Sequence, residues 1–283
     1  MSESLVSLWT AVRDQLERAG VEAPVREARL IVEVGAGVSR LQIITEPRAL
    51  VREDQVAAVR DIAARRAARE PLAYILGRKA FWTIDLEVSP HVLIPRPETE
   101  LVVELALKSM GPAAPARVLD IGVGSGAILL ALLSERAHWS GVGVDVDAGA
   151  LAVAAANVRR LGLEARVELR QGRWWPAELG EFDVVVSNPP YIPSADIEGL
   201  APEIAAHEPR LALDGGPDGL AAYRALFANL SAHLRPAGVF VFEVGRGQAE
   251  GVAALAAAHG FSTEPPVVDL AGVERAIVGR RRR

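Results

Sequence analysis

Four consecutive residues, Asn188, Pro189, Pro190 and Tyr191, combine a hydrogen-bonding amide, two rigid residues and a flat ring. The Asn188 side-chain oxygen can accept one hydrogen bond, and the main-chain carbonyl of Pro189 can accept another. Consecutive prolines restrict the backbone and so fix where that carbonyl points. A planar NH₂ group held there, with the Tyr191 ring on its flat face, presents its nitrogen for reaction. The alternative is a proline-rich turn without chemistry.

The acceptor groups indicate transfer of a group to an amide or amino nitrogen. An amide nitrogen is a poor nucleophile because its lone pair is delocalised. Two acceptors on its hydrogens raise the electron density on nitrogen and stabilise the positive charge that develops there. The sequence shows no dedicated base, and its five histidines form no metal-ligand pattern. We therefore expect catalysis by positioning, with an electrophile supplied by a cofactor and without a metal.

A glycine-rich loop follows an apolar stretch and precedes a helix that is predicted to begin near Ala127. It consists of Gly122, Val123, Gly124, Ser125 and Gly126. Glycines let the backbone approach a ligand closely, and the following helix start adds unpaired N–H groups. The spacing Gly-x-Gly-x-Gly differs from that of dinucleotide-binding loops, which favours S-adenosyl-L-methionine over NAD. The alternative is a tight turn between strand and helix.

An acidic residue, Asp145, ends the next predicted strand about twenty positions after the glycine loop, where a carboxylate can accept both ribose hydroxyls of a nucleoside. The alternative is helix capping, for which Asp147 competes. Trp174 and Trp175 follow the third predicted strand. A tryptophan there can stack on adenine or serve packing alone. Together with the glycine loop, Asp145 favours a nucleoside-containing cofactor.

These residues must meet at one edge of a sheet. From residue 116 onward, short apolar stretches alternate with Ala- and Leu-rich helical stretches. This alternation predicts an α/β fold with a mainly parallel sheet covered on both faces. Ligands bind such sheets beyond the carboxyl ends of the strands. The predicted strands span residues 117–121, 141–145, 166–170, 182–187 and 239–243.

The first part of the chain has a helical pattern. Leu5, Trp9, Val12 and Leu16 fall on one helical face. Residues 1–77 are therefore expected to form a helical domain, and residues 78–95 a hairpin or linker. The second domain is placed over residues 96–283, and a helix can begin near Glu98.

Composition excludes several classes of protein. The 283 residues include no cysteine, which excludes disulfides and thiolate metal sites and permits a cytoplasmic location. The start lacks a signal-peptide profile, and no uncharged apolar stretch approaches the roughly 20 residues of a membrane span. A net charge of −5 argues against a grip on long nucleic acid. The basic end, Arg280 to Arg283, is expected to be a frayed, solvated tail.

The chain resembles the HemK-type or PrmC-type release factor glutamine methyltransferases over almost its whole length. The Asn-Pro-Pro-Tyr tetrad is shared with DNA-adenine and other amino methyltransferases. The blocks 92–100 and 208–220 are much more specific. The matching blocks span residues 70–77, 92–100, 120–126, 188–193, 208–220 and 243–248.

The resemblance implies a Rossmann-like, seven-stranded class I methyltransferase domain over residues 96–283. It implies that the helical domain helps to dock a class 1 peptide chain release factor. The expected reaction moves a methyl group from S-adenosyl-L-methionine to N5 of the glutamine in the Gly-Gly-Gln motif. By motif match, Asn188 to Tyr191 would clamp this glutamine. The implied cofactor contacts are Gly122 to Gly126, Asp145, Trp174 and Asn188, and Pro97 and Thr99 would line the same pocket.

The chain departs from the family sequence pattern at two positions, and two alternative functions remain open. The family often has an acidic residue just before Trp174, where this chain has Arg173, and a glycine after Phe81 is missing. An amino methyltransferase for nucleic-acid bases would use the same tetrad, but a basic face or target-recognition domain is not evident. A non-catalytic binding protein with the same fold is the other rival. The intact tetrad argues against it.

Overall fold

The computed structural model describes residues 3–282, and the chain divides into two compact units. The first unit comprises Met1–Gly77 and the distant segment Ala201–His207, and the second comprises Arg78–Leu200 and Glu208–Arg283. Within residues 3–282, no helix is long and apolar enough to cross a membrane.

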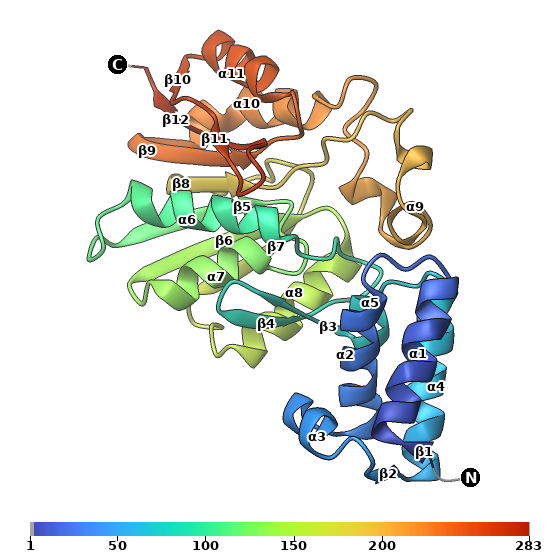
Figure 1. Cartoon of the computed structure of the whole chain (residues 1–283). Helices are drawn as coiled ribbons and strands as arrows, with labels where there is room; N and C mark the ends of the chain where they lie inside the picture. The colour runs from blue at the N-terminus through green and yellow to red at the C-terminus, as the bar shows by residue number, and fades with distance from the viewer. Residues whose placement is uncertain (1–2, 283) are drawn as a thin grey trace. The chain divides into compact units, whose positions relative to one another are not determined.

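Three helices form the body of the first unit (Figure 1): α1 (Leu5–Arg18), α2 (Pro24–Ala36) and α4 (Glu53–Ala67). They pack around a buried apolar core that includes Leu16 and Ile31. Gly35 allows a close approach, since a Cβ there would lie 2.9 Å from the Cα of Val59. The smaller elements are β1 (Glu3–Ser4), α3 (Arg40–Thr45), β2 (Leu50–Val51) and α5 (Leu72–Leu76).

The segment Ala201–His207, which contains α9 (Pro202–His207), belongs to this helical unit. Glu203 lies 3.0 Å from the Arg66 guanidinium and 2.7 Å from that of Arg69. Arg66 is buried and also pairs with Glu27. A buried guanidinium needs such carboxylate partners because its desolvation is costly. The sequence pattern gave no sign that this segment joins the N-terminal helices.

The second unit confirms the predicted α/β class. Within residues 3–282 its sheet has eight strands in the order β10–β12–β9–β8–β5–β6–β7, with β11 paired to β12. The run β9 to β7 is parallel, while β12 joins it antiparallel. The strands are β5 (Ala116–Ile121), β6 (Trp139–Asp145), β7 (Val167–Gln171), β8 (Phe182–Ser187), β9 (Leu234–Glu243), β10 (Phe261–Thr263), β11 (Val267–Val268) and β12 (Glu274–Arg281).

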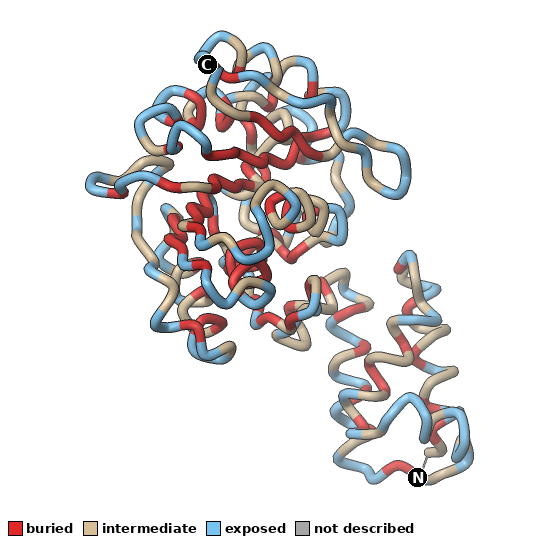
Figure 2. The backbone as a smooth tube through the Cα atoms, turned by 90° about the vertical axis from the view of Figure 1, so that its left-hand side faces the viewer, coloured by how far each residue is buried: buried red, intermediate tan, exposed pale blue. Residues whose placement is uncertain are grey.

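Helices cover both faces of this sheet. Successive strand residues point to opposite faces, so Val184 joins one core and Val185 the other. In Figure 2 the buried residues of the second unit run through its interior and the exposed residues lie at its periphery. One face carries α6 (Glu100–Ser109), α7 (Ala127–Glu135) and α8 (Ala148–Arg160), and the other carries α10 (Ala221–His233) and α11 (Ala249–Ala258). The 3₁₀ turns are η1 (Pro97–Thr99), η2 (Ile197–Gly199) and η3 (Arg210–Ala212).

A separate hairpin pairs β3 (Arg78–Phe81) with β4 (Ile84–Glu87). Trp82 turns it with a φ of 53°, a conformation that favours glycine. Its main-chain N–H donates to Glu100 at 2.9 Å, and its indole N–H donates to Glu135 at 2.8 Å. These two bonds explain how the hairpin turns without the expected glycine.

The expectation of a frayed basic tail is wrong through Arg281. The strand β12 ends at that residue, where Arg281 pairs with Phe261 and Arg280 pairs with Ser262. Its residues Ile277 and Val278 are buried, so the strand is held by apolar packing as well as by the ladder. The last residue, Arg283, lies outside the described residues.

Candidate active site

The glycine loop is attached to the end of β6 by main-chain hydrogen bonds. The N–H groups of Gly122 and Val123 donate to the carbonyl of Val144 at 2.8 and 2.9 Å. Gly126 begins α7 with a φ of 86°, and a Cβ there would lie 2.8 Å from Leu130 Cδ1. The loop therefore needs glycine at Gly126 for both its backbone conformation and its packing.

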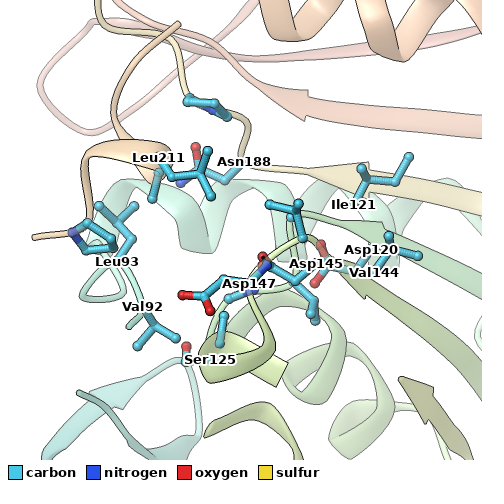
Figure 3. A pocket seen from close by; sticks show the side chains of 18 of the residues that line it. Val92, Leu93, Asp120, Ile121, Ser125, Val144, Asp145, Asp147, Asn188 and Leu211 are labelled. Atoms are coloured by element: carbon cyan, nitrogen blue, oxygen red, sulfur yellow. Dashed lines mark hydrogen bonds between the residues drawn. The ribbon is translucent and has the colours of Figure 1, made fainter. Parts of the chain in front are cut away.

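Asp145 stands at the carboxyl end of β6, beside this loop (Figure 3). Its Oδ2 accepts from the N–H of Gly124 at 2.9 Å, and its Oδ1 accepts from the N–H of Asp147 at 3.0 Å. Burial raises the pKa of Asp145, against the effect of these two donors. Each carboxylate oxygen has a second lone pair, so both can still accept from a ligand hydroxyl.

A second carboxyl group, Asp120 on β5, lies deeper in the same cavity. Its Oδ2 accepts from the N–H of Leu129 at 3.2 Å, whereas no partner within residues 3–282 reaches its buried Oδ1. Burial raises the pKa of Asp120 to about 7, and the N–H of Leu129 opposes that rise. A buried acceptor without a partner is suited to a cationic or hydrogen-bond-donating ligand.

Asn188 follows β8 and joins two residues far away in the sequence. Its Nδ2 donates to Thr99 Oγ1 at 3.1 Å, and that hydroxyl donates to Glu243 Oε2 at 2.6 Å. Glu243 ends β9 and is buried. Burial raises its pKa to about 7, while the Thr99 hydroxyl and Arg275 act in the opposite direction. Two hydrogen bonds thus link the side chains of Asn188, Thr99 and Glu243 at the edge of the sheet.

Most of the residues predicted for the site meet in one cavity of the second unit. Those that line it are Thr99, Gly122, Val123, Gly124, Ser125, Asp145, Trp174, Asn188 and Pro190, while Pro97, Gly126, Pro189 and Tyr191 do not. The Tyr191 ring packs against the core between the sheet and α10. Its hydroxyl donates to Glu243 Oε1 at 3.3 Å, and Gln248 Nε2 donates to its carbonyl at 2.8 Å.

Several polar residues in this cavity or directly behind it were not singled out from the sequence. Asp120 and Glu243 are buried carboxyls at strand ends, a signal that becomes visible once the sheet is placed. Arg96 lines the cavity and forms an ion pair with the buried Glu208, which also accepts from the N–H of Ile94 at 3.4 Å. Both residues of that ion pair lie in the blocks that carry the family resemblance. Arg173, the departure from the family pattern beside Trp174, also lines the cavity.

Comparison with known proteins gives two domain matches. Residues 7–77 match the PrmC N-terminal domain, and residues 118–207 match a methyltransferase domain. Among solved structures, a Pyrococcus furiosus methyltransferase is 18% identical with a TM-score of 0.52, covering 77% of this chain and 97% of that one. The catalytic domain of hMettl16 in complex with MAT2A 3'UTR hairpin 6 is 16% identical with a TM-score of 0.59, covering 78% and 82%. These likenesses show the fold.

The methyltransferase match and the relatives imply S-adenosyl-L-methionine as the cofactor. The cavity fits such a molecule in its chemistry. Asp145 offers acceptors for a diol beside the glycine loop. The unpartnered Oδ1 of Asp120 offers a negative group to a cationic molecule, and Trp174 offers an aromatic ring.

Curated relatives match nearly the full chain. The release factor glutamine methyltransferase of Caulobacter vibrioides is 48% identical and covers 99% of this chain and 97% of its own. That of Rhodospirillum rubrum is 46% identical and covers 95% of this chain and 82% of its own length. That of Geobacter sulfurreducens is 43% identical and covers 96% of this chain and 94% of its own length. At this identity and coverage, the chain belongs to the release factor glutamine methyltransferase family.

Proposed function

We propose that this chain transfers a methyl group from S-adenosyl-L-methionine to the N5 amide nitrogen of the glutamine in the Gly-Gly-Gln motif of class 1 peptide chain release factors. The observation that carries the proposal is the cavity, which brings Asn188 together with the glycine loop and Asp145. One cavity therefore offers an amide-binding side chain and a nucleoside-binding edge. The relatives, named for the same reaction, support this proposal.

On the substrate side, Asn188 Oδ1 and the main-chain carbonyl of Pro189 accept the two N–H groups of the glutamine amide. The acceptors hold the nitrogen in one orientation and stabilise the positive charge that develops on it. The stiffness of Pro189 and Pro190 restricts this second acceptor. Because Pro189 does not line the cavity, the role of its carbonyl stays a prediction. Tyr191 supports this loop from the core side through its bond to Glu243. Stacking of its ring on the substrate remains a prediction.

On the cofactor side, Asp145 accepts the ribose hydroxyls, and the glycine loop lets the backbone approach the ligand. Trp174, which lines the cavity, would cover the adenine, and Thr99 lines the pocket beside Asn188. When bound, S-adenosyl-L-methionine supplies a methyl group on a positively charged sulfonium. Asp120 contributes a negative charge to this cationic environment.

The helical unit is proposed to help dock the release factor. Its surface exposes large apolar side chains, among them Val25, Leu41 and Ile44. Val25 and Ile44 line one hollow of this unit together with Val6 and Trp9, and a contiguous apolar surface of this kind is suited to a protein partner. A cytoplasmic location is part of the proposal, because the substrate acts in translation.

Mass spectrometry tests the proposed function. The purified chain is incubated with S-adenosyl-L-methionine and a class 1 release factor, and the factor is digested and analysed. We expect one glutamine, that of Gly-Gly-Gln, to gain the mass of one methylene group. A release factor whose glutamine is replaced by glutamate serves as the control. Methylation of a DNA or RNA base with no change in the release factor would reject the proposal.

A further inference from the structure

Three buried or half-buried side chains form a hydrogen-bonded chain behind the cavity. Asn188 Nδ2 donates to Thr99 Oγ1 at 3.1 Å, and Thr99 Oγ1 donates to Glu243 Oε2 at 2.6 Å. Thr99 is 4% exposed and Glu243 is 1% exposed, so solvent does not compete for these bonds. The three residues come from η1, the end of β8 and the end of β9.

The chemistry of these groups determines the direction of the chain. An ionised carboxylate can only accept hydrogen bonds, and a threonine hydroxyl has a single proton to donate. When Glu243 is ionised, Thr99 must give its proton to the carboxylate and can only accept on its other side. Asn188 must therefore turn its NH₂ group toward Thr99. Within residues 3–282, no hydrogen bond engages Asn188 Oδ1, which is left for a ligand.

We propose that Glu243 is a positioning residue for the methylation reaction: its carboxylate, acting through Thr99, fixes the Asn188 amide so that Oδ1 accepts from the substrate NH₂. The proposal rests on the proposed function, since it assigns Oδ1 to the glutamine amide. It goes beyond that function by naming the group that decides which end of the Asn188 amide faces the substrate.

Protonation of Glu243 would reverse the direction of the chain. A neutral carboxyl can donate to Thr99, whose own proton then turns toward Asn188. The amide would flip to place Oδ1 against Thr99, and its NH₂ cannot accept from the substrate. Burial raises the pKa of Glu243 to about 7, so this change falls near neutral pH. The groups that face Glu243 are Thr99, the Tyr191 hydroxyl, Arg275, Glu98 and, on its main-chain carbonyl, the Tyr223 hydroxyl.

Nuclear magnetic resonance tests the orientation without any turnover. The full chain is labelled with nitrogen-15, and the Asn188 side-chain signals are identified by their loss in Asn188→Asp. We expect these signals to move with pH around a midpoint near 7 in the wild type. They should stay fixed in Thr99→Val and in Glu243→Gln. Wild-type signals that do not titrate, or that titrate equally in both variants, would overturn the proposal.

Kinetics supply a second readout. Thr99→Val is expected to lower kcat about 100-fold while the KM for S-adenosyl-L-methionine stays within about threefold, because the lost group orients an acceptor. Thr99→Ser keeps the hydroxyl and should restore most of the rate. The wild-type rate should fall about tenfold for each pH unit below about 7. Glu243→Gln should remove the contribution of Glu243 and leave only that of Asp120, whose pKa burial also raises to about 7.

Tyr223→Phe is the matched control. Its hydroxyl donates to the main-chain carbonyl of Glu243 at 2.8 Å and does not touch the carboxylate. This variant should lose stability but keep both the pH profile and the titration of the Asn188 signals. A wild type that shows the titration without methylating a release factor would reject the proposed function and leave the orientation by Glu243 supported. A methylating enzyme whose Asn188 signals ignore Glu243 would reject the orientation alone.

Discussion

The two ends of the cavity are built in different ways. At the cofactor end, main-chain hydrogen bonds between neighbouring strand ends hold the glycine loop, and Asp145 is fixed by N–H groups of the same region. At the substrate end, Asn188 is held by the side chains of Thr99 and Glu243, which come from distant parts of the chain. The cofactor end should thus be sensitive to added volume, and the substrate end to the loss of a polar atom. Both ends hold a buried carboxyl group whose pKa is raised to about 7.

The largest expected effect is at the substrate end. Asn188→Ala removes the acceptor and should lower kcat about 100- to 1,000-fold. The dissociation constant for S-adenosyl-L-methionine should rise only moderately, because the glycine loop and Asp145 are untouched. Steady-state turnover assays measure kcat, and cofactor titration measures the dissociation constant. Unchanged turnover would remove Asn188 from the mechanism, and the substrate end would then not be more sensitive than the cofactor end to the loss of a polar atom.

A methyl group added at Gly126 tests the cofactor end. Gly126→Ala combines a left-handed residue, at about 1–2 kcal/mol, with overpacking against Leu130, at about 1–3 kcal/mol. The free energy of unfolding, measured in urea, should fall by the sum of these two contributions, and the affinity for the cofactor should fall as well. Gly162→Ala is the control, since its φ is 67° but no atom lies within 4 Å of the added Cβ. Equal losses in both variants would show that packing at Gly126 is unimportant.

Asp145 and Asp147 separate ligand binding from helix capping. Asp145→Ala should raise the KM for S-adenosyl-L-methionine about 10- to 100-fold, because a hydrogen bond to a charged group contributes roughly 1.5–3 kcal/mol. Asp147 caps α8 by accepting from the N–H of Gly149 at 2.7 Å. Its replacement by Ala should mainly lower the free energy of unfolding, by about 1 kcal/mol. The reverse pattern would assign the ligand to Asp147.

The remaining expected effect concerns the dependence of the free energy of unfolding on pH. Burial raises the pKa of Asp120 from 3.8 to about 7, so the folded state favours the protonated acid. The unfolded chain loses that proton first as pH rises, and Asp120 therefore lowers the free energy of unfolding progressively between about pH 4 and 7. Asp120→Asn should flatten this decline in the ligand-free protein, as thermal unfolding at several pH values would show. In this variant the free energy of unfolding should still decline with pH to some extent, because burial also raises the pKa of Glu243 to about 7.

The cofactor end was largely predictable from sequence because its parts are local. A strand, a glycine loop and the next strand's last residue follow each other within one β–α–β unit, and parallel strands bring their carboxyl ends to one edge. Strand β8 and its Asn-Pro-Pro-Tyr end were found in the same way. The strands β10 to β12 were missed. β10 and β11 are only three and two residues long, and the eight residues of β12 end in the basic run that was expected to be a solvated tail.

Tertiary structure alone decided how the substrate end is held. No spacing rule relates Thr99, Asn188 and Glu243. The pairing of β8 with β9 brings Asn188 near Glu243, and the turn η1 before α6 supplies Thr99. The same holds for Glu203, whose ion pairs with Arg66 and Arg69 join a segment to helices more than a hundred residues away.

By itself, the sequence determined the α/β class, the glycine loop and the residue types able to hold a planar amide. These follow from local periodicity and from the conformations that glycine and proline allow or forbid. The burial of Asp120 and Glu243, and with it their raised pKa values, was decided by the folded state. Desolvation depends on every element packed around a carboxyl group, and no stretch of sequence contains that information.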